Sequence, residues 1–97
     1  MKSEVINMYL RLVGYSQGME LVNWFNDKYE KDSSGKYTKS YANVTVGGFS
    51  IQGTDEQLQE AMKFVNNKDW RHEFTFNHPT EVTKGIVENL KKESKIN

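Results

Sequence analysis

The stretch from residue 41 to residue 57, YANVTVGGFSIQGTDEQ, decides the fold. Two runs that alternate between apolar and polar residues flank Gly47 and Gly48, a two-residue signal for a tight turn. This pattern predicts a β-hairpin with strands over 37–46 and 49–53. Its register places the apolar residues on one face: Val46 opposite Phe49, Val44 opposite Ile51 and Ala42 opposite Gly53.

A helix start follows the hairpin directly. Thr54 and Gln57 fit a capping box, in which the threonine caps the helix and the glutamine side chain reaches back to the cap residue. The helix then shows apolar residues at helical spacing, and Asn66 and Asn67 provide a suitable end. The apolar residues expected to face the core are Leu58, Ala61, Met62 and Val65.

The sequence on either side of this unit predicts two more strands and two more helices. Residues 5–13 and 70–77 alternate with a period of two, which is typical of strands, and His72 belongs to the inward set. Residues 17–31 predict a helix with Ser16 as its N-cap, and residues 80–94 predict a final helix. The inward positions are Ile6, Met8, Leu10 and Leu12; Leu21, Val22, Phe25 and Tyr29; Trp70, Phe74 and Phe76; and Val82, Ile86, Val87 and Leu90.

The predicted order of elements is β-α-β-β-α-β-α, which indicates an α+β fold. Two strand–helix–strand units around a hairpin form the split, ferredoxin-like plan. This plan predicts an antiparallel sheet in the order 4-1-3-2, with the first two helices on one face. We expect a single domain over 1–97, with the ferredoxin-like unit in 1–78. An added C-terminal helix over 79–97 would pack at the sheet edge or over the open face.

The composition of the chain narrows the function classes. Its 97 residues contain no cysteine, which excludes disulfides, cysteine-type zinc sites and a thiol nucleophile, and we expect no cofactor and no metal. Thirteen basic and thirteen acidic residues leave no net charge, which argues against a strong nucleic-acid footprint. No window approaches the roughly 18–20 apolar residues of a membrane span, so no membrane partner is expected.

The N-terminal residues suggest a location for the protein, and its amino-acid composition suggests an origin. The first residues do not read as a signal peptide, which predicts a cytoplasmic protein. Lysine outnumbers arginine eleven to two, and asparagine occurs nine times. This skew is typical of AT-rich coding in low-GC bacteria and bacteriophages. A phage-encoded protein in the host cytoplasm is therefore one expectation.

Residues 14–22, GYSQGMELV, resemble the signature of the acylphosphatase family, which has a ferredoxin-like fold. Three residues match the signature identically, and the resemblance covers roughly residues 5–65. It implies a site for the anion of an acyl phosphate at the start of the first helix, where backbone N–H groups would hold it. The residues of this anion site are Ser16, Gln17 and Gly18.

The chain departs from the acylphosphatase pattern at a position that matters. The resemblance implies that the family's phosphate-binding arginine corresponds to Val22 and its catalytic asparagine to Asn43. A guanidinium group stabilises the charge of a transferring phosphoryl group, and valine does not. The departure predicts weak anion binding, in an acylphosphatase-like hydrolase or an inactive relative.

The open face of the predicted sheet carries the candidate partner-binding residues. Tyrosine and arginine are common hot spots of protein interfaces, and aromatic rings on such a sheet also stack single-stranded bases. We expect the face to bind another protein or a second copy of the chain, with nucleic acid as the less favoured partner. The candidate residues are Tyr9, Arg11, Tyr41, Asn43, Arg71 and Glu73.

Three function classes follow from these patterns. The first is a small protein without catalytic residues, an inhibitor or regulator that docks on a larger protein complex, consistent with a phage protein acting on a host system. The second is a single-stranded nucleic-acid-binding module that uses the open sheet face. The third is the acylphosphatase-like hydrolase or its inactive relative.

Overall fold

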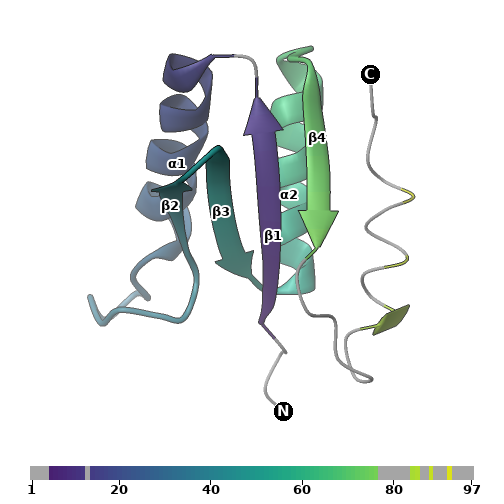
Figure 1. The fold of residues 1–97 in the computed structure, drawn as a ribbon. Coiled ribbons are helices and arrows are strands. Elements are labelled where there is room, and N and C mark those ends of the chain that lie inside the picture. Colours follow the sequence, from purple (N-terminus) through teal and green to yellow (C-terminus); the bar gives the residue numbers. More distant parts are fainter. Residues whose placement is uncertain (1–4, 13, 77–83, 86–87, 89–91, 93–97) are drawn as a thin grey trace.

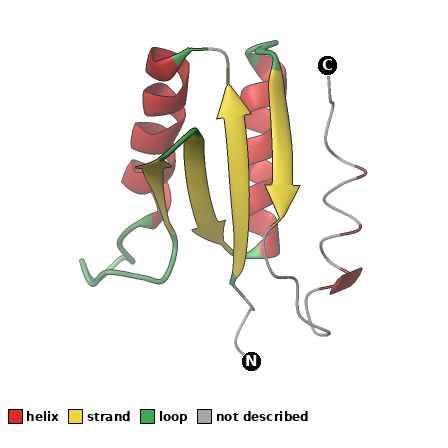
Figure 2. Cartoon of the chain, viewed as in Figure 1, coloured by secondary structure: helices red, strands yellow, loops and turns green. Residues whose placement is uncertain are grey.

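The computed structural model describes residues 5–12, 14–76, 84–85, 88 and 92 of the chain. The elements form a four-stranded antiparallel sheet in the order β2-β3-β1-β4, with both helices on one face (Figures 1 and 2). This α+β, ferredoxin-like arrangement confirms the predicted fold. Its elements are β1 (Ile6–Leu12), α1 (Tyr15–Tyr29), β2 (Tyr41–Thr45), β3 (Gly48–Gly53), α2 (Asp55–Asn67) and β4 (His72–Phe76).

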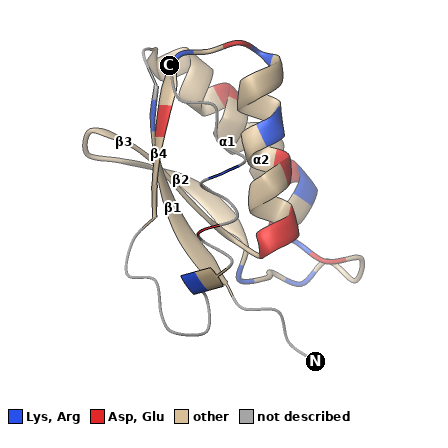
Figure 3. Ribbon diagram, turned by 90° about the vertical axis from the view of Figure 1, so that its right-hand side faces the viewer, with Lys and Arg blue, Asp and Glu red and all other residues tan. Residues whose placement is uncertain are grey.

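The sheet and the helix pair form two layers, which Figure 3 shows from the side. The core lies between them, and the residues predicted to point inward from α1 and α2 fill it from the helix side. His72 also points inward as predicted and is 4% exposed. The largest fully buried side chains are Met8, Leu10, Leu21, Phe25, Ile51, Leu58, Met62 and Val65.

The β2–β3 hairpin differs from the predicted register. Thr45 pairs with Gly48, so the turn residues are Val46 and Gly47. Gly47 supplies the left-handed backbone angle of this turn, with φ at 83°. Gly48 instead belongs to β3. A Cβ atom there would lie 2.6 Å from the backbone oxygen of Leu10 in β1, so this strand position requires glycine. The predicted pairing of Val46 was therefore wrong, and that side chain is fully exposed at the tip of the hairpin.

The apolar face of the hairpin survives this shift in register. Val44 pairs with Phe49 and Ala42 with Ile51, in place of the partners predicted from the sequence. The shift moves each pairing by two residues, and the side chains of a strand alternate with a period of two. The same side chains therefore point toward the helices.

The N-terminus of α1 also differs from the prediction. The helix begins at Tyr15, with Gly14 as the residue before it and no side chain capping it, so Ser16 is not the N-cap. Gly18 consequently lies inside the helix. A Cβ atom there would come within 1.8 Å of the Phe49 ring, so the missing side chain allows α1 to approach β3.

The strand β2 begins at Tyr41 and not at residue 37. The preceding backbone bonds to the end of α1: the Thr38 N–H donates to the Glu30 carbonyl at 2.8 Å, and the Thr38 hydroxyl donates to the Tyr29 carbonyl at 2.8 Å. These contacts hold residues 37–40 against the helix end. They are therefore a loop and do not extend the sheet.

The predicted capping box at the start of α2 is confirmed. The Thr54 side chain accepts from the Gln57 N–H, and the Gln57 side chain accepts from the Thr54 N–H at 2.9 Å. The Ser40 hydroxyl donates to the same Gln57 oxygen, which ties the loop before β2 to the start of α2.

Two further predictions concern the C-terminal helix and membrane-spanning segments. The predicted helix over 80–94 falls largely outside the described residues. Within the part of the chain that the structure describes, neither helix combines the length and the apolar character that crossing a bilayer requires.

Candidate functional site: the outer face of the sheet

The face of the sheet that points away from α1 and α2 carries most of the predicted partner-binding residues. We call it the outer face. The strand register places its residues in rows, because directly paired residues point to the same side. Its members are Asn7, Tyr9 and Arg11 of β1; Tyr41, Asn43 and Thr45 of β2; Ser50 and Gln52 of β3; and Glu73 and Thr75 of β4.

Two tyrosines stand out on the outer face. Tyr9, on the central strand β1, is 39% exposed, and Tyr41, on the edge strand β2, is 43% exposed. Their hydroxyl groups make no hydrogen bond within the described residues. Each side chain therefore offers an aromatic surface and a free hydroxyl group, the combination that favours tyrosine at interfaces.

A cross-strand ion pair neutralises one corner of the outer face. Arg11 and Glu73 are directly paired residues of β1 and β4, and their charged groups lie 3.7 Å apart. Both side chains are more than half exposed, so the pair adds little to stability. Arg71 is also exposed, but it precedes β4 and lies outside the sheet.

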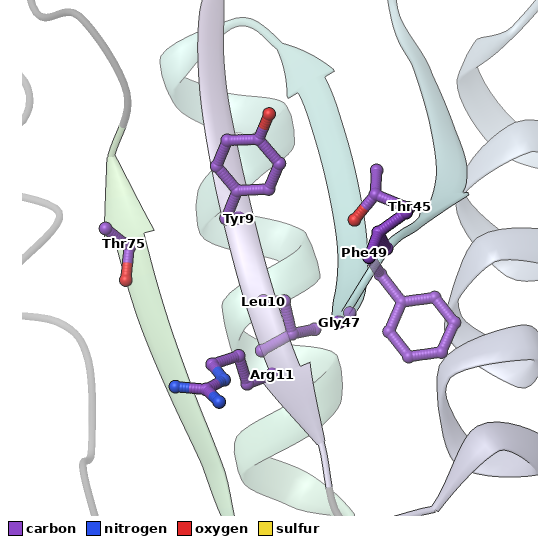
Figure 4. Close-up of a pocket in the computed structure, with 9 residues that line it drawn as sticks. Tyr9, Leu10, Arg11, Thr45, Gly47, Phe49 and Thr75 are labelled. Carbon is purple, nitrogen blue, oxygen red and sulfur yellow. The ribbon is translucent and has the colours of Figure 1, made fainter.

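A hollow of about 350 Å³ opens on the outer face beside the hairpin (Figure 4). Tyr9 and Arg11 border it from β1, and Thr75 from β4. Gly48 explains the hollow, because this strand position has no side chain where its neighbours on the outer face have one. The remaining lining residues are Leu10, Thr45, Val46, Gly47 and Phe49.

A second hollow, of about 320 Å³, lies on the other side of the same hairpin. Gly14 and Tyr15 at the start of α1 border it, together with Val44 of β2. The Tyr15 ring lies 6.3 Å from the Phe49 ring and is 67% exposed, and Val44 is also exposed. The hairpin thus projects between two concave surfaces, and apolar side chains are accessible on both sides of it.

The structure brings together part of the predicted partner-binding set. Tyr9 and Arg11 share the first hollow, whereas Tyr41 and Asn43 lie on the outer face away from it. Sequence reasoning missed the hollow itself. Its signal was a glycine at an outward strand position, which could be assigned only after the hairpin register was known.

The predicted anion-site residues lie in the first turn of α1. Ser16 is exposed, whereas Gly18 is buried against Phe49, and the side-chain oxygen of Gln17 is buried without a partner among the described residues. Val22, at the position of the family's arginine, is buried in the core. Asn43 points away from the helices, and its side-chain oxygen accepts from the Val44 N–H at 3.1 Å.

Ionisable side chains do not form a metal centre in the described part of the chain. No three histidine, aspartate or glutamate side chains lie close enough there to hold an ion. Comparison of the chain with protein-family models, with curated proteins and with solved structures finds no match. The outer face, with its exposed tyrosines and its hollow, is therefore the candidate functional site.

Proposed function

We propose that this chain is a small interaction protein without catalytic activity, an inhibitor or regulator that docks on a larger protein through the outer face. The observation that carries the proposal is the pair of exposed tyrosines on the outer face, Tyr9 and Tyr41, of which Tyr9 borders a hollow. Aromatic residues next to a pocket are typical anchors of protein interfaces, because few residues supply most of the binding energy.

The charge of the outer face favours a protein partner over a nucleic acid. Arg11 is the one basic residue of that face among the described strands, and Glu73 already neutralises it. Nucleic-acid binding relies on several cations that contact phosphates. A neutral face with phenols, amides and hydroxyls instead suits a partner surface of mixed polarity.

The proposal is tested by affinity capture from a lysate of the source cells or their host, with quantitative mass spectrometry of the retained proteins. We expect one protein to be retained by the native chain and lost with the double variant Tyr9→Ala, Tyr41→Ala. Tyr37→Ala is the matched control, because Tyr37 is 72% exposed on the loop before β2 and lies off the sheet. The control variant should retain the same protein as the native chain.

Three outcomes would contradict the proposal. A retained protein that binds the double variant as strongly as the native chain would remove the outer face from the interface. Salt-dependent binding of single-stranded RNA or DNA, lost in the same double variant, would assign the face to nucleic acid. Hydrolysis of a generic acyl phosphate by the purified chain would show catalytic activity.

A further inference from the structure

The two edge strands of the sheet, β2 and β4, differ in whether their outward backbone groups are hydrogen-bonded. Along the free edge of β2, the Asn26 side chain of α1 bonds to the backbone of Ala42 in both directions. Its Nδ2 donates to the Ala42 carbonyl at 3.0 Å, and its Oδ1 accepts from the Ala42 N–H at 2.7 Å. The next outward N–H, that of Val44, donates to the side chain of Asn43. The chain thus occupies this edge with its own side chains.

The Asn26 contact also shows which backbone N–H and C=O groups of β4 point away from the sheet. In an antiparallel ladder, directly opposite residues alternate between hydrogen-bonded and non-hydrogen-bonded pairs. Since the Ala42 groups bond to Asn26, the pair Ala42–Ile51 is non-hydrogen-bonded, and Ile51 bonds to Met8 on its other side. Met8 therefore does not bond to Phe76, its partner in β4.

The same alternation continues along β4. The N–H and C=O groups of its even-numbered residues, His72, Phe74 and Phe76, point away from β1. No other described backbone group bonds to the N–H of Phe74 or Phe76. The β4 edge is thus open along its length within the described residues, and open edges pair readily with another strand.

We infer that the β4 edge is a strand-pairing site for a second copy of this chain. The two β4 strands would pair antiparallel about a two-fold axis at Phe74, which would lie opposite Phe74 of the second copy. His72 would then lie opposite Phe76 of the second copy. Pairing through β4 uses the same edge in both copies, and the β2 edge of each copy is already bonded to its own side chains. The assembly therefore closes at a dimer and does not extend into a filament.

The charges of β4 agree with this register. Glu73 would lie opposite Thr75 of the second copy, so no like charges face each other on the outer side. A register centred on Glu73 would instead oppose two glutamates, which is unfavourable. Phe76, which is partly buried at the edge of the core, would gain apolar cover from the second copy.

The inferred dimer has a geometric consequence. A two-fold axis perpendicular to the sheet keeps side chains on the same side, so two four-stranded sheets would join and present both outer faces together. The inference rests on the edges of the sheet and is independent of the proposed function. Failure of one therefore leaves the other standing.

Substitutions of Thr75 by an acidic and by a basic residue should change the affinity of the dimer in opposite directions. Thr75→Glu would oppose Glu73 of the second copy at two symmetric positions, whereas Thr75→Lys would pair with it. We expect the dimer dissociation constant, measured by sedimentation on the full chain, to rise roughly 2- to 30-fold for glutamate and to fall similarly for lysine. Asn23→Glu and Asn23→Lys change the net charge equally from the exposed side of α1 and should leave it unchanged.

Hydrogen exchange of the Phe74 amide is the second readout, because it does not depend on a variant. Its protection should rise with protein concentration, as the second copy supplies the missing acceptor. A chain that stays monomeric up to about 1 mM would overturn the inference. So would protection of this amide that is independent of concentration, which would indicate pairing within one chain, or equal effects of the Thr75 and Asn23 variants.

Discussion

Gly18 is the residue at which α1 comes closest to the sheet. An alanine in an exposed helix position would stabilise the helix by about 1 kcal/mol relative to glycine. Here the added methyl group would overlap the Phe49 ring, and the clash outweighs that gain. The glycine that resembles a loop residue of the acylphosphatase signature therefore has a packing role in this fold.

We expect Gly18→Ala to lower the free energy of unfolding by about 1–3 kcal/mol, measured by urea denaturation. Gly14→Ala is the control, since the nearest atom to a Cβ there is 3.7 Å away in the flexible Gln17 side chain. The control should change stability by about 0.5 kcal/mol or less. Equal effects of the two substitutions would show that α1 does not rest on Phe49 as described.

Asp32 organises the loop between α1 and β2. The hydroxyl of Ser34 donates to its carboxylate at 2.6 Å and lowers the pKa of Asp32 below its ordinary value, with the Lys36 N–H at 3.1 Å as a second cause. A carboxyl pKa that is lower in the folded state stabilises the loop above the unfolded pKa. That contribution disappears as the pH falls through the folded pKa.

The amide resonances of Ser34 and Lys36 should therefore titrate with a midpoint below the ordinary aspartate value of about 3.9, measured by NMR. Ser34→Ala removes the largest cause and should move the midpoint upward. An unchanged midpoint in this variant would mean that the hydroxyl does not hold the carboxylate.

At the scale of elements, Asn26 joins α1 to the free edge of β2. Its amide group matches the donor and acceptor of one strand residue, so it substitutes for a neighbouring strand. We expect Asn26→Ala to lower the free energy of unfolding by about 1–3 kcal/mol, because it leaves two backbone groups of Ala42 without their partner. Urea denaturation measures this change.

Asn23→Ala, at an exposed position of the same helix, serves as the comparison. It should cost no more than about 0.5 kcal/mol. If both asparagine variants lost the same stability, the loss would reflect helix propensity and not the closure of the β2 edge.

The elements also show which features the sequence could predict. Thr54 and Gln57 contact each other within one helical turn, so their capping box could be predicted from neighbouring residues in the sequence. The position of the turn at Val46 and Gly47 could not be predicted in this way. It depends on the backbone carbonyl of Leu10, distant in the sequence, which leaves room only for glycine at Gly48 in the strand.

The candidate site also combines features that local sequence predicts with features that depend on distant residues. Period-two alternation in the sequence predicts that Tyr9 and Tyr41 share one face, because side-chain direction in a strand is a local property. The hollow beside Tyr9 depends on the pairing of three strands and on a missing side chain at Gly48. The blocked β2 edge likewise depends on a helix residue, Asn26, that shows no sequence pattern.

At the scale of the whole molecule, the helix layer and the outer face have separate roles in this account. The helices bury the apolar side of the sheet and supply stability, while the outer face remains available for a partner. The five tyrosines of the chain report on both layers. Tyr9 and Tyr41 lie on the outer face, Tyr15 at the start of α1, Tyr29 against the core, and Tyr37 on the loop before β2.

Fluorine NMR of the chain labelled with 3-fluorotyrosine tests the central claim most directly. On titration with the protein recovered by affinity capture, the account predicts that the resonances of Tyr9 and Tyr41 shift or broaden, while those of Tyr29 and Tyr37 stay in place. Assignment follows from single tyrosine-to-phenylalanine variants. Changes confined to Tyr29 or Tyr37, with Tyr9 and Tyr41 unaffected at saturation, would contradict it.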